Sequence, residues 1–155
     1  MEAEKCTPKA TAFCVGCVLV ARLPFGTGHP TVLAGAYSRE LDGNTHAEAN
    51  ALAKLLALSP EELSALCPSA NLHDILAHTD VYTTMEPCSV RTSGLAPCAD
   101  ALIAAGVRRC FIGVQEPDDF VTCEGAMKLK DAGIEVIWVK GAEEKCLEVA
   151  RKGHT

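Results

Sequence analysis

The sequence predicts an α/β fold in which an antiparallel pair of strands joins a parallel half-sheet. Residues 13–37 contain two apolar segments separated by a turn rich in Pro and Gly, and we expect these segments to pair. Residues 81–151 alternate short apolar segments with helix-like ones. Such alternation implies parallel strands joined by right-handed crossovers. Together these observations predict an α/β sandwich with one five-stranded mixed sheet.

The first half of the chain is expected to supply the strand pair and a buried helix. Residues 13–20 form a nearly continuous apolar run, which is typical of a strand buried on both faces. Thr31–Tyr37 should pair with this strand across a turn at residues 24–30. An Ala- and Leu-rich segment at residues 43–59 predicts a helix buried on most sides. A short surface helix is expected at Pro60–Leu66.

The second half of the chain is expected to alternate strands with helices. Strands are expected at residues 81–84, 110–114 and 134–139. Each is followed by an expected helix, at residues 97–105, 124–132 and 142–151 respectively. The helix at 97–105 begins with a proline and is followed by a glycine, the usual asymmetry of helix ends. Ligands in such sheets bind beyond the carboxyl ends of strands. This rule places the expected site at residues 85–98.

Composition predicts one globular domain spanning residues 1–155. This length suggests a single core, and 48% hydrophobic with 22% charged residues excludes bulk disorder. The apolar runs are too short to span a membrane, and the first residues lack a signal-peptide core. Nine cysteines are an odd number, which argues against a full disulfide framework. We therefore expect a cytoplasmic protein with reduced thiols and no membrane partner.

The charge balance argues against a nucleic-acid partner. The chain has 14 basic and 20 acidic residues, a formal net charge of −6. Proteins that bind a phosphate backbone carry basic patches, because much of their affinity comes from counterion release. A small substrate is therefore expected.

Two segments hold residues typical of a catalytic zinc site. His46 lies at the start of the buried helix, whereas Cys88 and Cys98 each follow a proline near a predicted helix start. A helix N-terminus favours the thiolate form that binds metal. One His and two Cys leave the fourth zinc position for water, as in catalytic rather than structural sites. We therefore expect Zn²⁺ on these three residues.

Glu48 is the expected catalytic residue. Zinc lowers the pKa of its water, and a carboxylate must then carry the proton to a leaving group. Glu48 lies two residues after His46, so it can face the same space without being a ligand. Residues 45–48 alternatively fit a helix capping box, and each cysteine alone fits a buried apolar position. The joint order His-x-Glu, Pro-Cys, Pro-Cys favours the zinc-deaminase signature.

These motifs resemble the cytidine-deaminase-like superfamily of hydrolytic zinc deaminases. Nine residues separate Cys88 from Cys98, a long spacer similar to that of the riboflavin-pathway pyrimidine deaminases. The fungal members of that branch are most similar, through the pattern Glu-Pro-Cys-Ser-x-Arg-x-Ser-Gly at residues 86–94. Further matching segments are residues 13–16, 37–41, 43–48, 114–117 and 120–121. The resemblance implies a three-layer α/β/α fold around the mixed sheet.

The resemblance also implies a substrate and an assembly. The substrate would be 2,5-diamino-6-ribitylamino-4(3H)-pyrimidinone 5′-phosphate, whose 2-amino group leaves as ammonia. Arg91 is the first candidate for the phosphate, because arginine favours bidentate phosphate contacts. Ser93, Asn44 and Arg39 are further candidates for substrate binding, whereas Glu86 is expected to bond backbone. Superfamily members assemble as dimers or tetramers, so a homodimer is expected.

Two other functions remain open at this stage. The same fold would suit a deaminase of free cytidine, deoxycytidylate or guanine. An inactive zinc-binding subunit that acts by interaction is a further alternative. The presence of Glu48 argues against inactivity, because inactive relatives often lose the catalytic acid.

Overall fold

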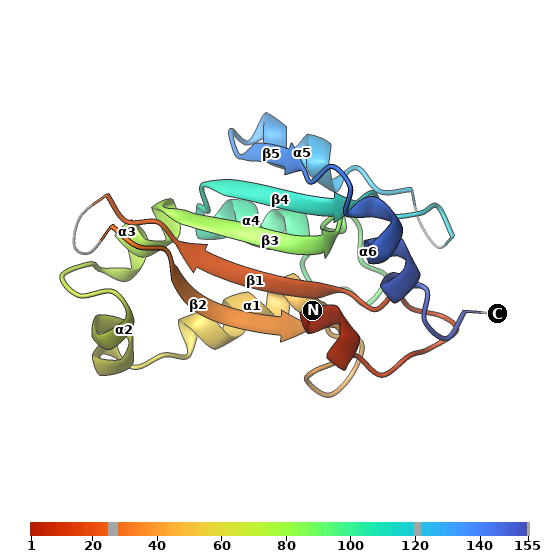
Figure 1. The fold of residues 1–155 in the computed structure, drawn as a ribbon, viewed down its shortest axis with the longest axis horizontal. Helices are drawn as coiled ribbons and strands as arrows, with labels where there is room; N and C mark the ends of the chain where they lie inside the picture. Colours follow the sequence, from red (N-terminus) through yellow and green to blue (C-terminus); the bar gives the residue numbers. More distant parts are fainter. Residues whose placement is uncertain (25–27, 120–121, 155) are drawn as a thin grey trace.

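A five-stranded mixed sheet forms the centre of the protein (Figure 1). The computed structural model describes residues 1–24, 28–119 and 122–154. The strands, in chain order, are β1 Gly16–Ala21, β2 Thr31–Tyr37, β3 Thr79–Met85, β4 Arg109–Val114 and β5 Glu135–Trp138. Their spatial order is β2-β1-β3-β4-β5, with β1 antiparallel to both neighbours and β3, β4 and β5 mutually parallel. The predicted union of a strand pair with a parallel half-sheet is confirmed.

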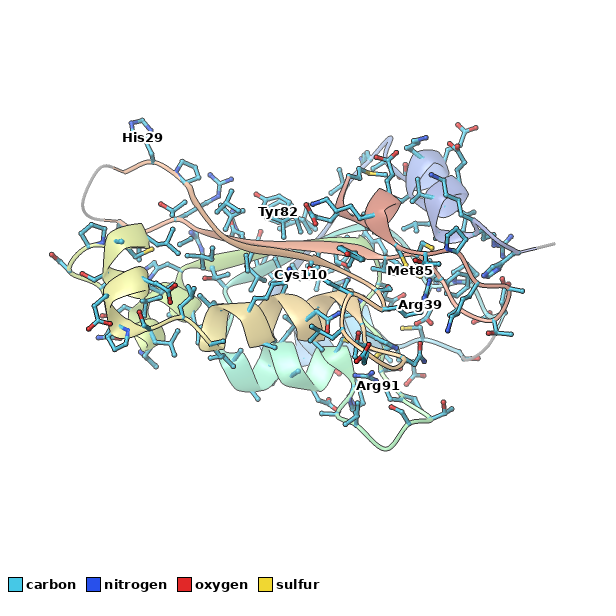
Figure 2. All side chains as sticks on the ribbon, turned by 90° about the horizontal axis from the view of Figure 1, so that it is seen from below. His29, Arg39, Tyr82, Met85, Arg91 and Cys110 are labelled. Carbon is cyan, nitrogen blue, oxygen red and sulfur yellow. The ribbon has the colours of Figure 1, made fainter. Side chains whose placement is uncertain are left out.

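Helices cover both faces of the sheet and produce the three layers expected. The helices are η1 Glu2–Lys5 (a 3₁₀ turn), α1 Ala47–Leu56, α2 Pro60–Leu66, α3 Leu72–Ala77, α4 Cys98–Ala105, α5 Gly125–Asp131 and α6 Glu143–Ala150. Figure 2 shows α1 and α4 on one face, with η1 and α6 on the other. None of the helices in the described ranges is long and apolar enough to cross a membrane.

The main core lies between the sheet and the layer that contains α1 and α4. Leu19, Val81 and Ile112 point from three adjacent strands into this layer and are fully buried. Leu55 of α1 and Leu102 of α4 meet them from the helical side. Each such side chain contributes about 1.5–3 kcal/mol when fully buried. This layer therefore fixes where α1 and α4 begin.

Several boundaries differ from the predicted ones. The strand expected at 13–20 begins at Gly16, because Cys14 donates its N–H to Ala150 and Val15 donates to the Ser38 hydroxyl rather than to a strand partner. The helix α3 is not among the predicted elements; the Asn71 side chain caps it by accepting from Asp74 N–H. The turn expected at 24–30 includes residues 25–27, which lie outside the described residues, as do residues 120–121 of the matching segments.

The strand β3 begins two residues earlier than predicted because a buried ion pair occupies its start. Asp80 is fully buried and accepts hydrogen bonds from Arg22 Nε at 2.7 Å and Arg109 Nε at 2.8 Å. Burial alone would raise the pKa of the Asp80 carboxyl, but the Arg109 and Arg22 guanidiniums outweigh it and hold that pKa below its ordinary value. The apolar pattern that predicts strands leaves out a charged residue such as Asp80. The guanidiniums of Arg22 and Arg109 stabilise the Asp80 carboxylate inside the strand.

We predict that Asp80→Ala lowers the free energy of unfolding by about 3 kcal/mol, since removing one partner leaves two guanidiniums without their counter-charge. Asp119→Ala is the matched control, because Asp119 pairs with Arg151 on the exposed surface at 2.9 Å. Loss of the Asp119–Arg151 pair should lower the free energy of unfolding by less than about 1 kcal/mol. Denaturant unfolding of both variants measures the difference, and equal losses would contradict a special role for Asp80.

Candidate metal centre and cavity

Three predicted metal ligands converge at one edge of the sheet. His46 directly precedes α1, Cys88 follows β3, and Cys98 is the first residue of α4. The His46 Nδ1 atom lies 3.4 Å from Cys88 Sγ and 3.5 Å from Cys98 Sγ. All three ligand atoms lie within 4.8 Å of one another. His46 precedes Cys88 by 42 positions and Cys98 by 52 positions in the chain. The three residues nevertheless meet, as the sequence predicts.

The chemistry of this cluster fits zinc. A hydrogen bond from the Cys98 thiol lowers the pKa of Cys88 to about 4, and the same interaction raises the pKa of Cys98. The backbone N–H of Cys98 also donates to Cys88 Sγ at 3.3 Å. Two buried thiols this close do not both ionise without a cation between them, and Zn²⁺ prefers sulfur and imidazole ligands in a tetrahedral arrangement. The donor set therefore suits a zinc ion with one open position.

The capping-box alternative does not describe residues 45–48. His46 rather than Thr45 occupies the N-cap position of α1, and among the described residues no side chain caps this helix. The Thr45 hydroxyl instead donates to the Leu41 carbonyl at 3.1 Å. The imidazole is thus free of a capping role and can face the two thiols.

Glu48 lies in the first turn of α1 and is 3% exposed. The Thr83 hydroxyl lies 2.8 Å from Glu48 Oε1 and fixes one oxygen of the carboxyl group. Burial raises the pKa of Glu48, although His46 and Thr83 partly oppose the shift. A carboxyl group in this environment exchanges protons more readily near neutral pH than an exposed one does.

A cavity of about 270 Å³ opens beside the cluster. His46, Glu48 and Cys88 form part of its wall, so the metal site and the buried carboxyl face the same space. The four predicted substrate-binding residues, Asn44, Arg91, Ser93 and Arg39, also line it. Figure 2 shows Arg39 and Arg91 at the same end of the molecule as Met85, the last residue of β3.

Arg91 and Arg39 differ in what their guanidiniums bind. Arg91 Nη2 donates to the Asn44 carbonyl at 2.9 Å, while its buried Nε has no hydrogen-bond partner among the described residues. Arg39 is turned toward the N-terminal segment and bonds the carbonyls of Thr7 and Phe13. The Nε of Arg39 is likewise buried without a partner among the described residues, but Arg39 makes more hydrogen bonds to protein acceptors than Arg91 does.

The structure confirms one backbone role and adds one residue to the site. Glu86 accepts a hydrogen bond from Ala126 N–H at 2.8 Å, as expected. Glu116, in the loop after β4, lines the cavity with a buried Oε2 that has no partner within the described ranges. Burial raises the pKa of Glu116 to about 7. The sequence marked residues 114–117 only as a matching segment, because loop burial depends on tertiary packing.

The raised pKa of Glu116 predicts a pH-dependent stability. Between its ordinary value of 4.5 and about 7 the folded protein holds a proton that the unfolded chain has released, so stability falls as pH rises through this window. Glu116→Gln removes this effect. We expect the variant to melt a few degrees above the wild type at pH 8 and near it at pH 4.5, by thermal denaturation. The exposed Glu61→Gln should show no such pH trend; the same trend in both would refute the assignment.

The chain is similar to a defined family of proteins. A family model described as the cytidine and deoxycytidylate deaminase zinc-binding region matches residues 1–114. The diaminohydroxyphosphoribosylamino-pyrimidine deaminase of Schizosaccharomyces pombe is 39% identical over 153 residues, which are 99% of this chain and 33% of that protein. The riboflavin biosynthesis protein RibD of Actinobacillus pleuropneumoniae is 32% identical over 79% of this chain and 26% of its own length. The chain thus spans a third or less of these two relatives.

Solved structures show the same fold. The Rib2 deaminase of Aspergillus oryzae, as a C-terminal deletion mutant, superposes with a TM-score of 0.79 at 35% identity, covering 99% of this chain and 87% of that one. The same enzyme in complex with DARIPP gives a TM-score of 0.78 at 35% identity over 99% and 86% of the two chains. Because the superpositions cover 99% of this chain, they include the segments that carry the three predicted metal ligands.

Proposed function

Because this chain belongs to the cytidine and deoxycytidylate deaminase zinc-binding family, we propose that it hydrolytically deaminates 2,5-diamino-6-ribitylamino-4(3H)-pyrimidinone 5′-phosphate. The products are 5-amino-6-ribitylaminouracil 5′-phosphate and ammonia. One observation carries the proposal: His46, Cys88 and Cys98 converge at a cavity whose wall also holds the buried carboxyl of Glu48. The similarity over 99% of this chain to a diaminohydroxyphosphoribosylamino-pyrimidine deaminase supports a phosphorylated diaminopyrimidine as the substrate.

The proposed reaction assigns separate tasks to the ligands and to Glu48. Zinc, when bound by His46, Cys88 and Cys98, supplies the Lewis acidity that activates water. Glu48 takes a proton from the attacking water and passes it to the ring nitrogen. It then takes the second proton from the hydroxyl now on the carbon and passes it to the amine, so that the carbon–nitrogen bond breaks, a carbonyl forms and ammonia leaves. Since Thr83 fixes Oε1, we assign the proton transfer to Oε2. Burial of the carboxyl, which raises its pKa, suits a group that both accepts and donates a proton.

Arg91, Ser93 and Asn44 are proposed to hold the polar end of the substrate. The phosphate requires donors in a chain whose net charge is −6. Arg91 supplies a guanidinium that lines the cavity and is held there by the hydrogen bond from Nη2 to the Asn44 carbonyl. Ser93 adds a hydroxyl at the exposed mouth of the cavity, and Asn44 adds a side-chain amide. A fixed arginine that is positioned before binding recognises phosphate at low entropic cost.

We further propose a single domain over residues 1–155 that acts as a homodimer in the cytoplasm, with neither nucleic acid nor membrane as a partner. Exposed apolar side chains support an interface near the cavity. Val90 lines the cavity and is 54% exposed, and Leu41 and Leu95, which are 49% and 57% exposed, each lie two residues after the cavity-lining residues Arg39 and Ser93. A reducing compartment suits nine cysteines that are all free thiols, two of which must stay reduced to hold zinc.

Glu48→Gln tests the proposed mechanism. The isosteric change should keep one zinc per chain by metal analysis yet lower ammonia release at least a hundredfold, because the amide cannot accept the proton. Cys88→Ser is the matched control and should lose both zinc and activity. The wild type is assayed on the ribitylaminopyrimidine phosphate beside cytidine, deoxycytidylate and guanine. A preference for cytidine, deoxycytidylate or guanine would overturn the proposed substrate. A wild type that is active without zinc would overturn the proposed mechanism.

Arg91→Ala tests the phosphate contact. We expect KM for the phosphorylated substrate to rise about tenfold or more, with little change for the same compound without its phosphate, because a charge-assisted pair is lost. Arg108→Ala is the control, since Arg108 is exposed and does not line the cavity. Equal effects on both compounds would argue for a general structural role.

A further inference from the structure

Arg39 joins two walls of the cavity that are far apart in sequence. Its backbone N–H donates to the Thr45 carbonyl at 2.7 Å, directly beside the metal ligand His46. Its side chain reaches the opposite way, where Nη1 donates to the Phe13 carbonyl at 3.0 Å and Nη2 to the Thr7 carbonyl at 2.9 Å. One residue therefore links the loop before α1 to the irregular segment 6–14.

Segment 6–14 is held from two sides. Toward the C-terminus, the Cys14 N–H donates to the Ala150 carbonyl at 2.9 Å, and the His154 ring, which stacks on Phe13, lies 3.3 Å from the Ala12 carbonyl. The segment lies outside the sheet apart from an isolated bridge between Lys9 and Ala12. Yet Thr11, Ala12 and Phe13 belong to the cavity wall. Irregular backbone keeps a fixed position only where its carbonyls and amides have partners. The guanidinium of Arg39 provides such partners from the inner side.

Two thiols complete the arginine's environment. Nη2 lies 2.8 Å from Cys6 Sγ and 3.4 Å from Cys14 Sγ, so the two sulfurs and the Thr7 carbonyl share the two N–H groups of this nitrogen. The Cys6 thiol donates in turn to the Ser38 carbonyl at 3.0 Å. Both cysteines are buried free thiols. The two sulfurs hold the planar guanidinium in place without a carboxylate that would draw it away from the carbonyls.

The conformation of Arg39 is unfavourable in two respects. Its φ of 61° lies in the left-handed region that side chains rarely adopt. Its Nε is buried without a hydrogen-bond partner among the described residues, which costs free energy. Strained backbone of this kind concentrates at functional sites. The hydrogen bonds of Arg39 to the carbonyls of Thr45, Phe13 and Thr7 offset the cost of its positive φ and of its unpartnered Nε.

We propose that Arg39 is a positioning residue for the deaminase reaction, which holds Phe13 and the backbone next to His46 at a fixed separation. This proposal rests on the proposed function. It gives Arg39 a task other than direct substrate contact: the guanidinium sets the width of the cavity between its N-terminal wall and the metal ligands. The substrate ring is then placed against the reacting groups by a wall that cannot drift.

The test uses Arg39→Gly in the zinc-loaded protein. Glycine relieves the positive φ while deleting the guanidinium, so loss of function cannot be ascribed to new backbone strain. We expect one zinc per chain and a melting temperature near that of the wild type. We expect kcat/KM to fall about 10- to 100-fold, since a small misplacement of a substrate wall has effects of this size. Millimolar guanidinium ion should recover part of this activity by refilling the space.

Hydrogen exchange supplies a readout that does not depend on activity. Amides of residues 6–14 should exchange faster in Arg39→Gly than in the wild type, while the sheet stays protected. Arg39→Lys keeps the charge but lacks the planar fork, so it should remain closer to Arg39→Gly than to the wild type in both measurements. This second variant keeps the test open if the glycine variant does not fold.

Arg22→Ala is the matched control, because Arg22 also bridges distant segments but does not line the cavity. It should keep wild-type kcat/KM and show no response to guanidinium ion. Unchanged exchange at residues 6–14 together with kcat/KM within twofold of the wild type in Arg39→Gly would overturn the proposal. An inactive wild type would instead reject the proposed function, while fast exchange at residues 6–14 in Arg39→Gly would still show that the guanidinium holds this wall of the cavity.

Discussion

The starts of α1 and α4 meet at one edge of the sheet, and the rest of the site depends on this meeting. Both helices follow strands, β2 and β3, that run in the same direction on either side of β1. Their N-termini therefore emerge at the same edge, where backbone N–H groups favour negative charge. The Cys98 N–H donates to Cys88 Sγ at this point. The core beneath the sheet is what keeps the two helix starts in register.

Much of the fold and the metal cluster could be predicted from the sequence because the relevant signals are local. The strand and helix periods lie within short windows, and the ligands His46, Cys88 and Cys98 follow from helix starts and proline placement. Their proximity then follows from strand order. The sequence predicts Arg39 as a site residue, but the ion pair of Asp80, the buried carboxyl of Glu116 and the contacts of Arg39 with the N-terminal segment could not be predicted in the same way. Each depends on partners many residues distant, and on burial that only the assembled layers create.

Charge is distributed unevenly in this acidic protein. The net charge is −6, yet two arginines lie in the cavity wall and two more flank Asp80. Asp80 neutralises part of the second pair within the sheet, whereas backbone carbonyls and sulfurs receive Arg39. The cavity wall also holds the carboxyl groups of Glu48, Glu86 and Glu116, so its positive charge is local to the two guanidiniums.

The loop between Cys88 and Cys98 carries Arg91 and Ser93, and both of its ends are ligands in the same cluster. An ion held by those two thiols would close the loop into a ring and remove much of the conformational freedom of its members. Metal occupancy and anion affinity would then be thermodynamically linked, each strengthening the other through the same closed loop. A spacer longer than a tight Cys-x-x-Cys turn thus lets one coordination centre order a recognition element several residues away.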